Sequence, residues 1–203
     1  MRKKNIHVVP HQDQWATRRE GASRVSYPSA LREDSMNHGF FDLRDRPEFC
    51  SHIPEVSKSM GLQAILRALN APGSFFMSIG CEYRLNPTNG FSGNFTCYFH
   101  SYTDLTYRDP LRHASEEGMV DLAEHFLRQV EGSEDAVFGF EIGIQRMKHF
   151  FGNQAGYNLS LGLSGYGQTE EQAAQSYQVG AEQTAKAFIK LSRLLSLASS
   201  TPV

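Results

Sequence analysis

One histidine and two glutamates are the residues of this sequence that best suit acid–base chemistry. His100, Glu82 and Glu141 lie in three stretches that alternate between apolar and polar residues, so all three are predicted on the polar face of a sheet. A histidine between carboxylates titrates near neutral pH and could act as the general base of a small-molecule hydrolase, oriented by Glu82 or Glu141. No nucleophile or metal-binding spacing accompanies them in the sequence, so we keep catalysis as the alternative function.

A second set of candidate ligands recurs at every fourth residue of a predicted helix. It comprises His113, Glu117, Asp121 and His125. The apolar stripe of this helix lies on the opposite side, so these side chains are predicted to face solvent rather than hold a metal ion. Cys50, Cys81 and Cys97 lack the paired spacing of a zinc site or a disulfide framework. We therefore predict no metal, no cofactor and a reducing, cytoplasmic environment.

The polar face that carries the acid–base candidates is rich in small residues. A solvated face more often uses Lys, Glu and Thr, because glycine weakens a strand by about 0.5–1 kcal/mol relative to alanine. One interpretation is a shallow groove for a ligand, a peptide or a second subunit. The residues we assign to that binding face are Ser78, Gly80, Arg84, Tyr98, Tyr102, Gly143, Ser160 and Gly162. The other interpretation is that the face buries residues 25–53 of the same chain, which include Phe40, Phe41, Leu43 and Phe49.

The elements that must position this face follow from apolar periodicity. Helices are predicted over 54–70, 115–130 and 169–196, and strands over 74–85, 93–104, 136–147 and 156–166. This order, α-β-β-α-β-β-α, predicts an α+β fold with a mostly antiparallel four-stranded sheet and helices on one face. The strand residues predicted to face the helices are Phe75, Met77, Ile79, Phe95, Cys97, Phe99, Phe138, Phe140, Ile142, Leu159, Leu161 and Leu163.

The two halves of this core share a strand-strand-helix pattern. Ile79-Gly80 and Ile142-Gly143 are separated by nearly the same number of residues as the helical segments 122–128 and 184–190. We interpret this as a degenerate internal duplication, with convergence onto one pattern as the alternative.

The N-terminal residues form two short extended candidates, 5–9 and 14–20, separated by a polar turn. The stretch "IHVVPHQDQWATRREGASR", about residues 5–24, resembles the opening hairpin of a bacterial family called domain of unknown function 2188. That family has no assigned activity, so the resemblance implies at most a cytoplasmic bacterial origin. We divide the chain into this hairpin (1–24), an irregular linker (25–53), the α+β core (54–196) and a flexible tail (197–203).

Composition limits the classes of partner. The chain of 203 residues has 20 basic and 22 acidic side chains, which gives no strong uniform field toward nucleic acid. Glu82, Glu141 and Asp104 would also repel phosphate from the face that carries Tyr98 and Tyr102. No apolar run approaches the roughly 20 residues that cross a bilayer, and the N-terminal apolar stretch is too short for a signal peptide, so no membrane partner is expected.

Recognition is therefore the predicted function, with a protein partner or a second copy as the ligand. The contacts would come from the small-residue face and from the long final helix, whose end is predicted to overhang the sheet. The element order is similar to that of secretion chaperones, which bind effector segments as dimers, and would also suit an inhibitor or immunity protein. Those chaperones tend to be more acidic than this chain. A small-molecule enzyme that uses His100 is the alternative.

Overall fold

A computed structural model describes residues 6–10, 24–25, 30–31, 36–37, 39–87, 95–150 and 154–199. The sheet strands are β1 (Ile6–Pro10), β2 (Arg24–Val25), β5 (Phe76–Pro87), β6 (Cys97–Tyr107), β7 (Val137–Phe150) and β8 (Gln154–Gly167). A separate pair comprises β3 (Ala30–Leu31) and β4 (Met36–Asn37). The helices are η1 (Pro47–His52), α2 (Pro54–Ser57), α3 (Met60–Asn70), α4 (Pro110–His113), α5 (Glu116–Gln129) and α6 (Glu170–Ser199).

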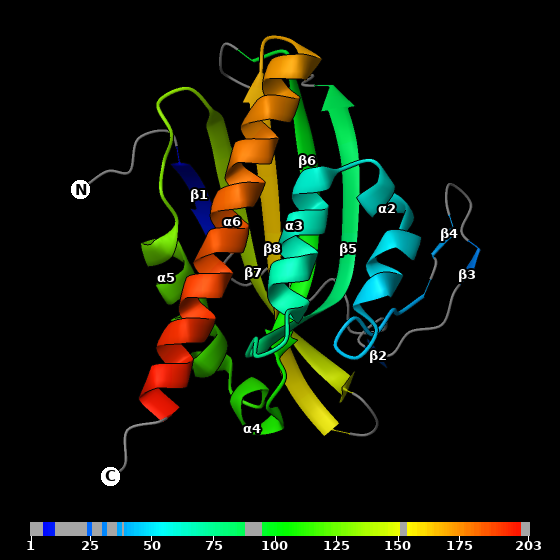
Figure 1. Ribbon diagram of the computed structural model, residues 1–203, viewed down its shortest axis with the longest axis vertical. Helices are drawn as coiled ribbons and strands as arrows, with labels where there is room; N and C mark the ends of the chain where they lie inside the picture. Colours follow the sequence, from blue (N-terminus) through cyan, green and yellow to red (C-terminus); the bar gives the residue numbers. More distant parts are fainter. Residues whose placement is uncertain are drawn as a thin grey trace.

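The main sheet has the strand order β1-β7-β8-β6-β5. Its four long strands are antiparallel to one another, and α3, α5 and α6 lie on the same face of the sheet (Figure 1). The predicted α+β fold with a four-stranded antiparallel sheet is confirmed. We call the face opposite the helices the far face.

The N-terminal strand joins this sheet at its edge. β1 runs parallel to β7, with Ile6 opposite Phe138 and Pro10 opposite Ile142. The predicted hairpin partner of this strand, residues 14–20, lies outside the described residues. Strand β2 also pairs in parallel with β7, opposite His149 and Phe150.

The main core lies between the helices and the sheet. Strand residues predicted to face the helices, such as Phe138, Phe140 and Leu163, pack there with Phe126 of α5 and Phe188 of α6. The ring centroids of Phe126 lie 5.3 Å from Phe140 and 5.0 Å from Phe188. Alternation thus predicted the inward face of β7 and β8 correctly.

A β-bulge overturns the predicted faces at the start of β5. The β5–β6 register shifts between Ser78 and Gly80. Before the shift, Phe76 and Ser78 point toward the helices, while Met77 and Ile79 pack with Met147 and Phe40 in a separate cluster. One extra residue in the bulged strand reverses the alternation, so the predicted inward positions of Met77 and Ile79 and the predicted outward position of Ser78 are wrong.

Three smaller predictions also change. The helix expected over 54–70 is interrupted at Ser59, which caps α3 by accepting a hydrogen bond from the Leu62 N–H at 3.0 Å. His113 lies in α4 and is buried, so it does not share a solvated helix face with Glu117. Phe95, predicted as a strand residue that faces the helices, precedes β6 instead, and its ring lies 5.6 Å from that of Tyr166.

Candidate functional site

The strand register arranges the predicted site residues in rows across the far face. One row contains Arg84, His100, Ser164 and Gly139, from β5, β6, β8 and β7 in turn. The next contains Glu82, Tyr102, Gly162 and Glu141, and a third contains Gly80, Asp104, Ser160 and Gly143. Tyr98 lies opposite Tyr166 in a further row, so the sheet places all the predicted site residues except Ser78 on the far face.

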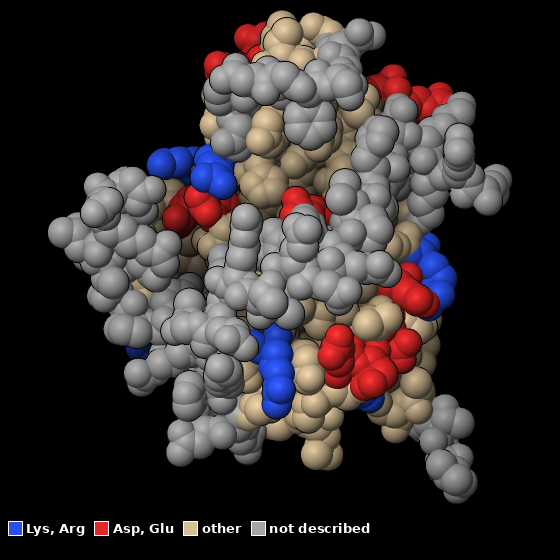
Figure 2. All heavy atoms as spheres, turned by 180° about the vertical axis from the view of Figure 1, so that it is seen from behind, with Lys and Arg blue, Asp and Glu red and all other residues tan. Residues whose placement is uncertain are grey.

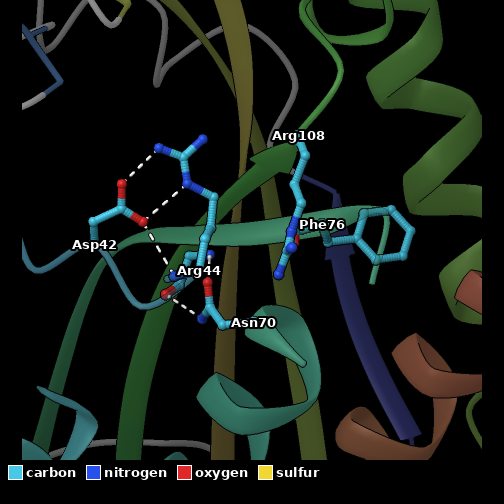
Figure 3. Close-up of polar contacts among 6 residues, drawn as sticks. Asp42, Arg44, Asn70, Phe76 and Arg108 are labelled. Atoms are coloured by element: carbon cyan, nitrogen blue, oxygen red, sulfur yellow. Dashed lines mark hydrogen bonds and ion pairs between the residues drawn. The ribbon is translucent and has the colours of Figure 1, made fainter. Parts of the chain in front are cut away.

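Ser78 is held on the helix side by polar contacts at the end of α3. The Asn70 Nδ2 donates to the Ser78 Oγ at 2.8 Å, and the Ser78 N–H donates to the Asn70 Oδ1 at 3.3 Å. Figure 3 shows this region, where Arg108 donates to the Phe76 carbonyl at 2.8 Å. These contacts fix the start of β5, and Ser78 has a structural position there.

The same view shows how the segment before η1 approaches this corner. The Arg44 guanidinium donates to both carboxylate oxygens of Asp42, with Nε to Oδ1 at 2.9 Å (Figure 3). That hydrogen-bonded pair lowers the pKa of Asp42. The charges of Arg44 and Arg108 both lower the pKa of Asp42. Burial lowers the pKa of Arg108, and the nearby Arg44 charge lowers it further.

The lower part of the far face is covered. Phe40 packs there against Met77, Ile79 and Met147. Gly143, Ser160 and Gly162 of the predicted groove are buried. Of the four aromatic and apolar residues proposed to cover this face, Phe40 does so. Phe41, Leu43 and Phe49 instead pack on the helix side with Leu62 and Leu66 of α3.

The upper part of the far face carries an aromatic patch, which we define as Tyr98, His100, Tyr102 and Tyr166. The Tyr98 ring lies 5.8 Å from that of Tyr166 and 6.5 Å from that of His100. All four side chains are partly exposed. Figure 2, which views the molecule from this side, shows uncharged surface in the upper part with acidic and basic side chains beside it.

His100 also lies close to Ser164 and Glu141 on the far face. Its Nδ1 lies 3.0 Å from the Ser164 Oγ. A Cβ at Gly162 would lie 3.3 Å from the His100 Cε1 and 3.2 Å from the Glu141 Cβ, so His100 and Glu141 border the space over this glycine on either side. Burial lowers the pKa of His100, and Glu141 opposes that shift. The ring is therefore neutral at neutral pH.

The two glutamates do not act together. Glu82 lies beside Arg84, with 3.5 Å between the Glu82 Oε1 and the Arg84 Nη1. Glu82 and Glu141 are on strands separated by β6 and β8, and with strands about 4.8 Å apart they are roughly 14 Å from each other. Of the two glutamates, Glu141 is the one that raises the pKa of His100, because the two side chains approach each other over Gly162.

Two residues beside His100 and Tyr98 were not selected from the sequence, namely Ser164 and Tyr166. Both share the alternation of Gly162 in β8, so parity alone placed them on the far face. Their closeness to His100 and Tyr98 depends on the pairing of β6 with β8, which the sequence does not specify.

Neither a metal-binding cluster nor a membrane-spanning helix is found among the described residues. Among the described residues, no group of three or more His, Cys, Asp or Glu side chains is arranged to hold a metal ion. No helix in the described ranges is both long and apolar enough to cross a membrane.

Comparison of the chain with family models, curated proteins and solved structures gave no match. The resemblance of residues 5–24 to domain of unknown function 2188 therefore stays a prediction.

Proposed function

We propose that this protein is a non-enzymatic recognition module that binds a protein partner through the aromatic patch. The observation that carries the proposal is the contact of the Tyr98 ring with those of Tyr166 and His100, all partly exposed on an antiparallel sheet whose lower part is covered. Tyrosines supply large contact areas with few rotatable bonds, and they are enriched among the residues that dominate binding energy.

Burial of the small residues narrows the proposed surface. Gly143, Ser160 and Gly162 are buried, so they shape the sheet and do not offer contact area. Tyr98, Tyr102 and Arg84 remain accessible. The binding residues we retain are therefore the aromatic ones with Arg84 at their border.

The end of α6 is a second contact region in this proposal. Leu191 is its last buried side chain, and Leu195 is partly buried against the core, whereas Leu194 and Leu197 are 46% and 69% exposed. Exposed leucines on a helix that extends past its core are suited to a partner surface.

We propose a cytoplasmic location and a bacterial origin. Cys50, Cys81 and Cys97 are all free thiols, which is typical of a reducing compartment. The resemblance of residues 5–24 supports the bacterial origin.

Site-specific photo-cross-linking in the host tests the proposed surface. A benzophenone amino acid at Tyr102 is expected to give a discrete protein adduct, and the same group at Glu124, exposed on α5, is expected to give none. Tyr98→Ala should then reduce the Tyr102 adduct at least about tenfold, since aromatic anchors contribute about 2 kcal/mol or more. Equal adducts at Tyr102 and Glu124, or an adduct that Tyr98→Ala leaves unchanged, would contradict the proposal.

A hydrolase is the second candidate, and one contact favours it. The Nδ1 of a neutral His100 lies 3.0 Å from the Ser164 Oγ and can accept the hydroxyl proton, which would activate the serine as a nucleophile. Glu141 lies on the other side of Gly162 from His100. The weakness is the position of Ser164 in β8, which pairs on both sides. Its neighbouring backbone N–H groups are engaged in the sheet rather than directed at an oxyanion.

Covalent labelling separates the two candidates. A fluorophosphonate probe should label Ser164 in a hydrolase, and His100→Ala should abolish that labelling. A recognition module should show no labelling of Ser164 above that of Ser133, a serine in the α5–β7 connection.

A further inference from the structure

Strand β5 is at the edge of the main sheet. Within the described ranges, β6 is its strand neighbour on one side and no strand pairs with its outer side. On the helix side, Phe41 and Cys50 pack near Cys81 and Tyr83. The stretch from Glu82 to Leu85 is more open, with Arg84 and Leu85 exposed. An edge with unpaired backbone groups is a template for another strand.

The charges on this edge are self-complementary. A two-fold axis through an antiparallel pair passes between two copies of the same residue. With Tyr83 opposite Tyr83 of the partner subunit, Glu82 lies opposite Arg84 of the partner subunit, and Arg84 opposite the partner's Glu82. Both side chains are on the far face and accessible, with exposed fractions of 40% for Glu82 and 59% for Arg84. Directly opposed unlike charges stabilise a strand pair, and like charges destabilise it.

The other side of the same stretch is also complementary. In this register Leu85 lies opposite Cys81 of the partner subunit, on the helix side of the sheet. Leu85 is 39% exposed although it is apolar, and Cys81 is flanked by the aromatic and aliphatic residues of the cluster around α3. Pairing would therefore cover two leucines along with the four charges.

We propose that two copies of this chain associate through antiparallel pairing of β5 centred on Tyr83. Charged residues on an edge also protect it against unwanted pairing, and a single charge type would do so. Here opposite charges two residues apart disfavour most strands and fit their own two-fold image. That charge pattern selects a second copy over an unrelated extended peptide.

The dimer would use Arg84, which also borders the aromatic patch, and it has a consequence for the recognition surface. The axis is perpendicular to the sheet, so both far faces lie on the same side of the extended sheet. The aromatic patches of the two copies would flank the axis and offer a two-fold repeated surface.

Charge reversal tests the pairing by sedimentation velocity and native mass spectrometry of the full chain. Glu82→Arg and Arg84→Glu each replace two attractive contacts with two repulsive ones, and each should weaken the dimer at least about tenfold. The double variant Glu82→Arg with Arg84→Glu should restore the dimer, because its charges are again complementary. The matched control reverses Glu124 and Arg128 of α5, which are also 3.5 Å apart and comparably exposed. Those reversals should leave the mass distribution unchanged.

The outcomes decide between the proposals separately. A wild-type chain that is monomeric up to high micromolar concentration would overturn the β5 dimer, as would a dimer that survives both single reversals. A monomer that keeps the Tyr102 cross-link would leave the recognition proposal standing. Far-ultraviolet circular dichroism of each variant excludes misfolding as the cause of a lost dimer.

Discussion

Replacement of Gly165 by alanine should destabilise the protein, because α6 crosses β8 at this residue. A Cβ on Gly165 would lie 2.0 Å from the Tyr177 backbone nitrogen and 2.3 Å from its Cα. An ordinary contact needs 3.4 Å or more, so the helix backbone would have to move by about 1.4 Å. No change of side-chain rotamer can relieve that overlap.

The magnitude follows from two opposing effects. Overpacking of this kind costs about 1–3 kcal/mol, and a contact with rigid helix backbone belongs at the upper end. Alanine recovers about 0.5–1 kcal/mol by restricting the unfolded chain. We expect a net loss of about 2 kcal/mol, which lowers the urea midpoint by about 1 M.

Urea unfolding followed by circular dichroism measures this loss, with Gly162→Ala as the matched control. Gly162 is on the same strand and faces the other side, where a Cβ would meet His100 and Glu141 at 3.2 Å or more. That variant should change the free energy of unfolding by less than about 1 kcal/mol. If Gly165→Ala is as stable as Gly162→Ala, the packing of α6 on β8 described above is wrong.

Three further predictions concern polar groups that are wholly or partly buried. Burial lowers the pKa of His100 below 6.5, so the folded chain binds a proton at His100 less readily than the unfolded chain does. The free energy of unfolding should therefore fall as the pH drops from about 6.5 through the folded-state pKa. In an NMR titration, Glu141→Gln should lower the pKa of His100 further, because Glu141 raises it. Tyr177→Phe should lower the free energy of unfolding by about 1–2 kcal/mol, because the Tyr177 hydroxyl donates to the Ser101 Oγ at 2.8 Å. Adding Ser101→Ala should recover part of that loss in thermal or urea unfolding. A Tyr177→Phe variant as stable as the wild type would refute this role. Ser78→Lys should destabilise the protein by more than about 2 kcal/mol, because it places a charge in the buried helix side of β5. An unchanged free energy of unfolding in the same assay would indicate that Ser78 lies on the far face instead.

The sequence predicted the fold because the signals for it are local. Alternation in β6, β7 and β8 identified the inward faces, and caps such as Ser115, which accepts from the Gly118 N–H at 3.1 Å, identified helix starts. The β5 bulge escaped prediction because one inserted residue needs no distinctive sequence. Its effect was to exchange Ser78 with Met77 and Ile79 between the two faces.

The proposed duplication agrees with the sheet in one respect and differs in another. The order β5-β6-β8-β7 places the second strand of each strand-strand-helix unit at the centre, as a pseudo-two-fold arrangement requires. Gly80 and Gly143 fall at opposite ends of one row. The bulge, however, puts Ile79 on the far face, whereas Ile142 packs among the helices.

Small residues occur on both faces of the sheet, and the structure gives them different reasons to be small. Gly165 admits the backbone of α6, and Gly162 lets His100 and Glu141 lie close on the far face. Gly143 is in the buried part of that face. A sequence shows that a side chain is small without showing which neighbour requires it, because the neighbour comes from another strand or helix. The binding surface that we propose therefore rests on the side chains left accessible, which are the aromatic residues beside the glycines, with Arg84 at their border.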